Sequence, residues 1–76
     1  MPFTKRFNNA RLRVNDGDHA PPHFHVLMND GREAWVTIEP IAIIHGKVKA
    51  REISEVLTWA KANQALLSAT FEELQQ

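Results

Sequence analysis

Two runs of alternating side chains, at residues 23–28 and 33–39, constrain the fold of this chain more than any other feature. Such alternation is typical of half-buried strands, and the Asn-Asp-Gly sequence at 29–31 is typical of a hairpin turn. A two-residue turn would mix polar and apolar side chains on both faces of the hairpin. A three-residue loop, with its glycine in the left-handed conformation, separates them. The pattern therefore predicts antiparallel strands with Phe24 opposite Val36.

This register divides the hairpin into two chemically different faces. The apolar face is the candidate core and contains Phe24, Val26, Met28, Ala34, Val36 and Ile38. The other face places His25 opposite Trp35 and His23 opposite Thr37. One side of the predicted hairpin therefore carries imidazole groups.

Further patterns predict the remaining elements. Residues 10–15 alternate as a strand, and residues 41–44 form a short apolar strand. Beyond them an amphipathic stripe indicates two helices, at about 50–62 and 64–75, with Asn63 as a candidate N-cap of the second. One long helix is the alternative.

These elements predict one α+β domain over residues 1–76, because no linker or repeat divides the chain. Residues 1–48 are expected to form strands and turns, and residues 49–76 to be helical. The predicted fold is a small antiparallel sheet of three to four strands. One or two C-terminal helices would cover one face of this sheet, since a sheet face and a helix stripe must bury each other.

The composition narrows the class of protein. The chain has no cysteine, which excludes a disulfide framework and a thiolate metal site. No apolar run approaches the roughly 18 residues of a membrane span, so we expect a cytoplasmic location and no membrane partner. Nine basic residues balance nine acidic residues, which does not favour a protein whose main task is to bind duplex nucleic acid.

The small size predicts a partner. The relation between surface and mass gives burial of only about 62% of the unfolded chain's surface on folding. A core of this size rarely supplies more than about 3–5 kcal/mol. We therefore expect a homodimer or a complex with another small protein.

A histidine cluster is the most unusual local chemistry in the chain. His19, His23 and His25 fall within seven residues, and the last two share one side of the predicted strand. Neutral imidazole is the commonest protein ligand for zinc and similar transition metals, and three histidines with an open position would form a catalytic zinc site. Glu39 is a candidate fourth ligand. Asp16 and Asp18, which flank Gly17, could also hold a cation, but acidic turn residues more often cap their own backbone.

A metal-free interpretation uses the same face. Arg11 and Arg13 alternate with apolar residues and would lie beside the histidines, together with Trp35 and Thr37. Arginine binds phosphate, tryptophan stacks on bases, and the pair His23 and His25 could act as catalytic acid and base on RNA. The alternative to both interpretations is structural: solvated histidines and arginines, with Trp35 in an oligomer contact. Whether the protein is an enzyme stays open at this point.

The chain resembles a known family at these residues. The segment Asp18-His19-Ala20-Pro21-Pro22-His23-Phe24-His25-Val26, followed by Gly31, Glu33 and Ala34, is similar to the small bacterial proteins grouped as domain of unknown function 4160. Within that signature His19, Pro21, Pro22, His23 and His25 can be matched. The resemblance implies a compact α+β domain in the bacterial cytoplasm, in a setting similar to that of toxin–antitoxin components. It implies no catalytic residues.

The first functional hypothesis is therefore a protein-interaction module, such as one component of a toxin–antitoxin pair. The alternatives are an RNA-binding or RNA-cleaving protein that uses the histidine and arginine face, and a metal site at His19, His23 and His25.

Overall fold

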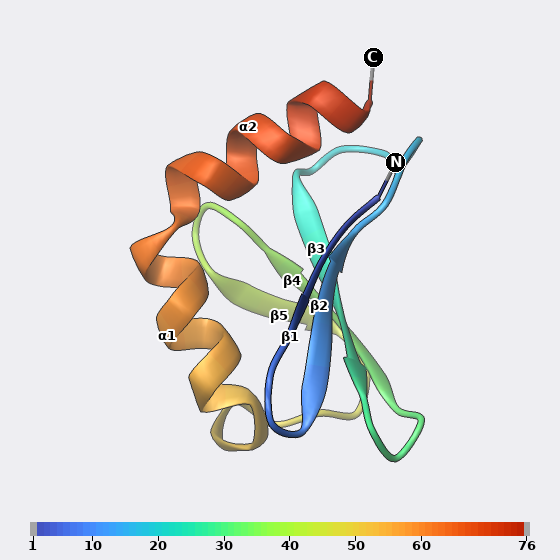
Figure 1. The fold of residues 1–76 in the computed structure, drawn as a ribbon, viewed down its shortest axis with the longest axis vertical. Helices are drawn as coiled ribbons and strands as arrows, with labels where there is room; N and C mark the ends of the chain where they lie inside the picture. The colour runs from blue at the N-terminus through green and yellow to red at the C-terminus, as the bar shows by residue number, and fades with distance from the viewer. Residues whose placement is uncertain (1, 76) are drawn as a thin grey trace.

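The fold comes from a computed structural model and is described for residues 2–75. A five-stranded sheet precedes the helical part of the chain (Figure 1). The elements in chain order are β1 (Phe3–Arg6), β2 (Ala10–Val14), β3 (His23–Met28), β4 (Glu33–Thr37), β5 (Ala42–His45), the 3-10 turn η1 (Ala50–Ile53), α1 (Ser54–Ala62) and α2 (Gln64–Leu74).

The sheet is an antiparallel meander in which each strand pairs with the next along the chain. In the β3–β4 hairpin, Phe24 lies opposite Val36 and His25 lies opposite Trp35. Gly31 has a φ of 96° and donates its backbone N–H to Met28 O. The predicted register and three-residue loop are therefore confirmed.

The predicted number of strands was too low, because the sheet contains five strands and not three to four. The additional strand, β1, pairs with β2 along the edge of the sheet. Its Phe3 ring stacks on the Trp59 ring of α1 at 6.5 Å, and the Phe7 ring that follows β1 meets Trp59 edge-on at 6.1 Å. Contacts with a helix that is distant in sequence thus stabilise β1. The alternation of side chains within one strand cannot predict such contacts.

The last strand, β5, begins one residue later than predicted, and a bulge interrupts its pairing with β4 between Trp35 and Val36. Gly46, which follows β5, has a φ of 104°, and a Cβ atom built on it would lie 2.1 Å from Glu33 O. Only glycine fits this close approach of two backbones. The chain can therefore leave the sheet directly beside the start of β4.

The helical part contains two α-helices, as the first interpretation predicted, and their ends lie close to the predicted ones. Asn63 occupies the predicted N-cap position of α2, and its backbone C=O accepts the N–H of Leu67, but its side chain makes no capping hydrogen bond. The side-chain amide instead donates to Trp59 O in the last turn of α1. Asn63 therefore links the end of α1 to the start of α2.

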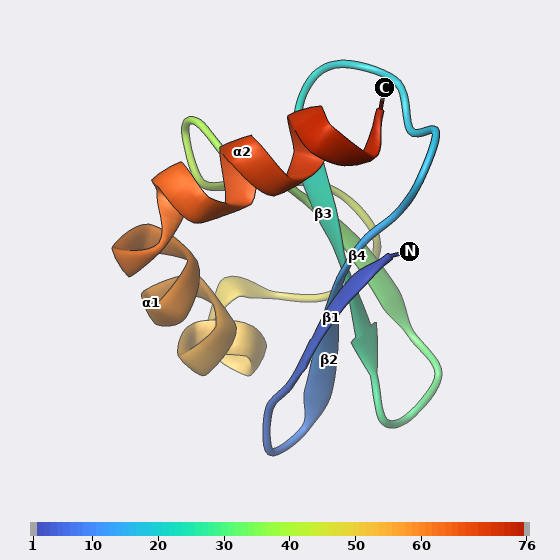
Figure 2. The ribbon, with the colours of Figure 1, turned by 45° about the horizontal axis from the view of Figure 1, so that its top comes forward.

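Both helices cover one face of the sheet (Figure 2). The core between these layers combines the predicted apolar face of the hairpin with Leu12 and Val14 of β2 and the helical stripe. Its helical members are Ile53, Val56, Ala60, Leu67 and Phe71. Because the helices cover this face of the sheet, the opposite face is the one that can carry a site.

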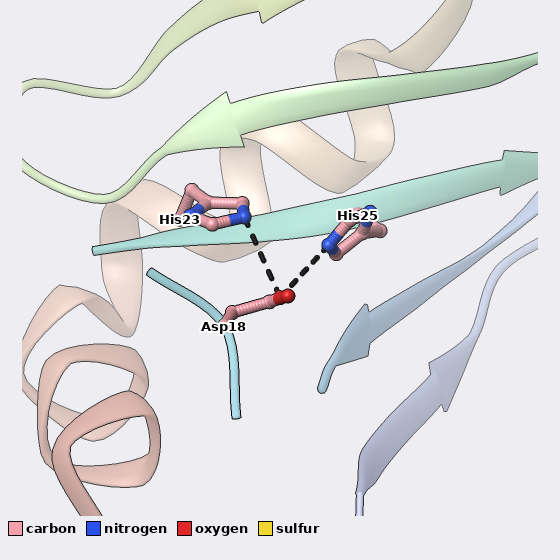
Figure 3. A group of neighbouring side chains, drawn as sticks. All are labelled: Asp18, His23 and His25. Carbon is pink, nitrogen blue, oxygen red and sulfur yellow. Dashed lines mark hydrogen bonds and ion pairs between the residues drawn. The ribbon is translucent and has the colours of Figure 1, made fainter. Parts of the chain in front are cut away.

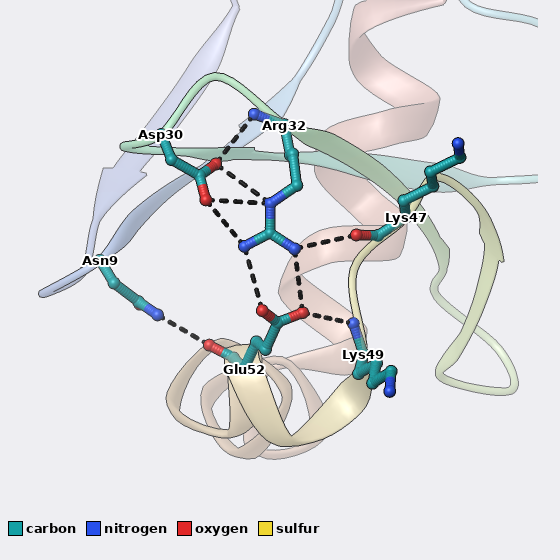
Figure 4. A network of polar contacts seen from close by, with 6 residues as sticks. All are labelled: Asn9, Asp30, Arg32, Lys47, Lys49 and Glu52. Atoms are coloured by element: carbon teal, nitrogen blue, oxygen red, sulfur yellow. Dashed lines mark hydrogen bonds and ion pairs between the residues drawn. The ribbon is translucent and has the colours of Figure 1, made fainter.

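A polar network joins the β3–β4 hairpin to η1 (Figure 4). The Arg32 guanidinium donates to both carboxylate oxygens of Asp30 and of Glu52, and also to Lys47 O. Hydrogen bonds from the Arg32 side chain are the main reason that the pKa values of Asp30 and Glu52 lie below their ordinary range. The carboxylates hold the pKa of Arg32 above its ordinary value. We call Asp30, Arg32 and Glu52 the arginine network.

Within residues 2–75, no helix is both long and apolar enough to cross a bilayer.

Candidate metal centre

The side of β3 that faces away from the core carries two histidine side chains. His23 and His25 are two residues apart on the strand and therefore project to the same side. The loop from 15 to 22 arches back over this side and brings Asp18 between the two rings (Figures 2 and 3). Gly17, with a φ of 70°, lies in the turn that reverses the chain just before Asp18. We call Asp18, His23 and His25 the histidine cluster.

One oxygen atom of Asp18 meets both rings. Its Oδ2 lies 3.0 Å from His25 Nε2 and 3.5 Å from His23 Nε2, as Figure 3 shows. The ligand atoms that these side chains can offer all lie within 4.8 Å of one another. Among residues 2–75 they form a group of three side chains that could hold one metal ion.

Hydrogen-bond acceptors hold the outer nitrogen of each ring. His23 Nδ1 donates to Pro21 O at 2.8 Å, and His25 Nδ1 lies 2.7 Å from Glu33 Oε2. A neutral imidazole has one N–H and one lone pair, so a proton at Nδ1 leaves the lone pair on Nε2. When His25 is in the tautomer that donates to Glu33, both lone pairs point toward Asp18 Oδ2.

A lone pair that faces a carboxylate oxygen is unfavourable unless a proton or a metal ion lies between the two atoms. At His25, a second proton on Nε2 would satisfy both carboxylates, because the imidazolium donates from both nitrogens. At His23, the 3.5 Å separation from Asp18 is an ion-pair distance that is too long for a good hydrogen bond. A metal ion placed among the three atoms would satisfy both rings and the carboxylate together.

Aromatic side chains cover the cluster. The Trp35 ring lies 5.7 Å from the His23 ring and 5.3 Å from the His25 ring, and the Phe71 ring lies 5.7 Å from that of His23. As a result, His23 is only 7% exposed and His25 only 6% exposed. The alternative of solvated histidines is therefore wrong, because the loop from 15 to 22 and these aromatic rings cover the imidazoles.

The other residues expected at a metal site are both exposed. His19 and Glu39 are solvent-exposed and lie outside the three-residue ligand group found in residues 2–75. The structure places Asp18 where a ligand from His19 was expected, although the two residues are neighbours in sequence. The side chain that turns toward β3 is that of Asp18, which directly precedes the predicted ligand His19.

The arginine and hairpin residues of the predicted RNA face separate in the structure. Arg13 of β2 lies opposite His25 and lines a pocket beside it, whereas Arg11 is exposed and lines a different depression with Arg6 and Asn29.

Two further residues of that face have structural contacts. Trp35 is 37% exposed, and its indole N–H donates to Glu33 Oε2 at 3.2 Å. The hydroxyl of Thr37 donates to Pro40 O at 2.6 Å within the β4–β5 connection. His45, at the end of β5, is exposed, and its ring lies 4.6 Å from that of Trp35.

Sequence reasoning favoured a turn-capping role for Asp18 and did not count Glu33 among the site residues. The register contained a signal for Glu33, because it lies two residues before Trp35, the partner of His25. Such diagonal neighbours across two strands are within reach of long side chains. No comparable signal existed for Asp18, whose position depends on the path of the loop.

Comparison with known proteins places the chain in a family of unknown function. Neither the curated proteins nor the solved structures that were searched contain a match. A family model described as "Domain of unknown function (DUF4160)" matches residues 10–72, a range that includes the histidine cluster and both α-helices. The chain therefore belongs to the DUF4160 family.

Proposed function

We propose that this protein binds one divalent transition metal ion, such as zinc, through His23 Nε2, His25 Nε2 and the carboxylate of Asp18. The observation that carries the proposal is the convergence of these three atoms while both outer nitrogens are engaged by acceptors. Histidines that bind a metal in proteins almost always donate their other N–H to a carboxylate or a backbone carbonyl. Glu33 and Pro21 O supply one acceptor of each kind.

The separations between the ligand atoms suit such an ion. Metal–ligand bonds of about 2.0–2.1 Å place neighbouring ligand atoms roughly 3.3 Å apart in a tetrahedral site and roughly 3.0 Å apart in an octahedral one. Asp18 Oδ2 lies 3.0 and 3.5 Å from the two Nε2 atoms. These two separations are close to the expected ones, and all three ligand atoms lie within 4.8 Å of one another.

Three protein ligands leave at least one coordination position for water or a substrate. Structural zinc sites have four protein ligands, whereas catalytic sites keep a position open. Two histidines with one carboxylate also form the ligand set of many iron(II) sites. Asp18, whose side chain is 26% exposed, lines a pocket that opens to solvent. The proposal therefore extends to a metal centre of the catalytic type.

Metal binding is tested by titrating zinc into protein purified without a histidine tag, with Asp18→Asn as the matched variant. We expect the parent protein to bind one equivalent and to melt at a higher temperature in excess zinc, because a ligand of the native state stabilises it. Asn keeps the size of the side chain and an oxygen acceptor but removes the charge, so affinity should fall at least about tenfold with unchanged circular dichroism. Absence of saturable binding to the parent protein contradicts the proposal.

A protein-interaction role is a second candidate, which exposed apolar side chains favour. Trp35 is 37% exposed and Ile44 of the neighbouring edge strand is 51% exposed. Tryptophan is enriched at the energetic centres of interfaces. We propose that this edge binds a second small protein, of the kind found in toxin–antitoxin pairs, or a second copy. Size-exclusion chromatography with light scattering tests it: a monomer with no co-purifying protein contradicts it.

The RNA-acting alternative has less support. Its acid–base pair would have to touch the phosphodiester, but both rings are more than nine-tenths buried, and its two arginines line different depressions. RNA cleavage and binding, like the cytoplasmic location, stay predictions from the sequence.

A further inference from the structure

A pocket of about 540 Å³ opens directly beside the histidine cluster. Arg13, Asp18, His25, Leu27 and Glu33 contribute to its walls. The pocket therefore contains two of the three proposed metal ligands and one positively charged side chain. A ligand in it could contact both the metal ion and that charge.

Arg13 is the unusual residue of this pocket. It lies opposite His25 in the β2–β3 pairing, on the side of the sheet away from the core. Its Nε atom is buried and has no hydrogen-bond partner among residues 2–75. A buried donor without a partner has a free-energy cost, so such groups in native proteins are usually satisfied by a ligand, water or ion.

The charge of the pocket determines when an anion can enter. Asp18 and Glu33 supply two carboxylates against the one guanidinium of Arg13. An anion is therefore repelled while the metal site is empty. A divalent ion offsets this negative charge and adds an open coordination position in the pocket that Arg13 also lines.

We propose, on the basis of the metal centre proposed above, that the pocket binds a small oxyanion, either a carboxylate or a phosphoryl group. One oxygen of the oxyanion occupies the open coordination position. A second oxygen accepts hydrogen bonds from the guanidinium of Arg13, whose planar fork matches carboxylate and phosphate groups. The substrate class of the metal centre is accordingly a small molecule with such a group, and the metal ion binds before it.

The experiment uses the full chain loaded with cobalt(II), whose visible absorption reports its coordination. Acetate and methyl phosphate are titrated separately into the parent protein, Arg13→Gln and Arg11→Gln. Arg11 is the matched control because it is on the same strand but outside this pocket. We expect at least one anion to change the spectrum of the parent protein saturably. Arg13→Gln should weaken that anion at least about tenfold, and Arg11→Gln should not change its affinity.

The outcomes separate the two proposals. If cobalt does not bind to the parent protein, the metal centre itself is wrong. If cobalt binds but neither anion binds saturably, or Arg13→Gln binds the anion as the parent does, the anion site is wrong and the metal centre stands. Heat of binding without a spectral change also overturns the anion site. Should Arg13→Gln not fold, Arg13→Lys replaces it, and its compact ammonium should also weaken the anion because it lacks the fork.

Discussion

The histidine cluster and the arginine network differ in how completely their charged groups are satisfied. In the arginine network the guanidinium of Arg32 meets two carboxylates and a backbone carbonyl, and Glu52 also accepts the backbone N–H of Lys49 (Figure 4). In the histidine cluster one carboxylate oxygen faces two ring nitrogens, and the longer of these contacts is 3.5 Å. The arginine network contains its own cation, Arg32. In the histidine cluster, three side chains offer ligand atoms that could hold a metal ion.

The number of polar groups left without a good partner distinguishes a candidate binding site from a structural ion pair. The arginine network joins segments that are distant in sequence, whereas the histidine cluster lies within residues 18–25. The Arg32 guanidinium already has acceptors for its N–H groups, so the arginine network needs no ligand. Its role is to attach η1 to the β3–β4 hairpin. The histidine cluster holds its rings from outside, through Pro21 O and Glu33, and keeps both Nε2 atoms directed at a common point.

Removal of both imidazoles should have the largest effect. In the double variant with His23→Gln and His25→Gln, zinc affinity should fall by at least about 100-fold, since even loss of an outer hydrogen-bond partner commonly costs 10–100-fold. Arg32→Gln is the control from the other cluster and should keep the parent affinity. Calorimetric titration measures both. Equal losses in the two variants would show that general stability, and not the ligand set, controls binding.

Removal of the outer partner should have a smaller effect on the same measurement. Glu33→Gln keeps an oxygen that accepts from His25 Nδ1 but loses the negative charge. We expect zinc affinity to fall about tenfold, at the lower end of the usual range for such partners. An unchanged affinity, with the fold intact by circular dichroism, would mean that Glu33 does not orient His25 for a metal ion.

The arginine network should instead contribute a pH-dependent stability. The pKa of Glu52 in the folded protein is lowered from its ordinary value of 4.5, first by hydrogen bonds from Arg32 and then by the N–H of Lys49. A lowered carboxyl pKa stabilises the native state fully above pH 4.5, and this contribution is lost as the pH falls through the lowered value.

Urea unfolding at several pH values, compared between the parent protein and Glu52→Gln, measures this contribution. The parent should be the more stable at pH 7, and the difference should shrink below about pH 4.5. A difference that is independent of pH down to strongly acidic conditions would mean that Glu52 acts through packing and not through its charge.

The smallest effect is expected at His19. This residue is exposed and outside the ligand group, so His19→Gln should change zinc affinity by less than about twofold. The same titration checks this outcome. A loss comparable to that of the double histidine variant would support the ligand set expected from the sequence and would exclude Asp18 as the third ligand.

The parts of this molecule that were predictable depend on local patterns. The hairpin register followed from alternation and from the need for a left-handed glycine in the loop, and both are short-range effects. The pairing of His23 and His25 on one side followed from the same alternation. The residues that complete the site depend on tertiary structure: Asp18 arrives through the path of the loop from 15 to 22, which no periodic pattern records.

The missed elements show the same limit. The edge strand β1 depends on contacts of Phe3 and Phe7 with Trp59, more than fifty residues along the chain. The burial of His23 depends on Phe71 of α2. A pattern confined to one strand predicts which side a ring faces but not whether a distant helix or loop covers it. The sequence therefore predicted the side of the sheet on which the histidines lie, but it left open the alternative that they are solvated, which their burial excludes.

X-ray absorption spectroscopy at the zinc edge, on protein loaded with one equivalent of zinc, tests the central claim most directly. Our account predicts two imidazole nitrogens at about 2.0–2.1 Å, with the remaining ligands being oxygen, and loss of the imidazole signal in the double variant with His23→Gln and His25→Gln. A shell of oxygen ligands without imidazole, or an unchanged spectrum in that variant, would contradict it.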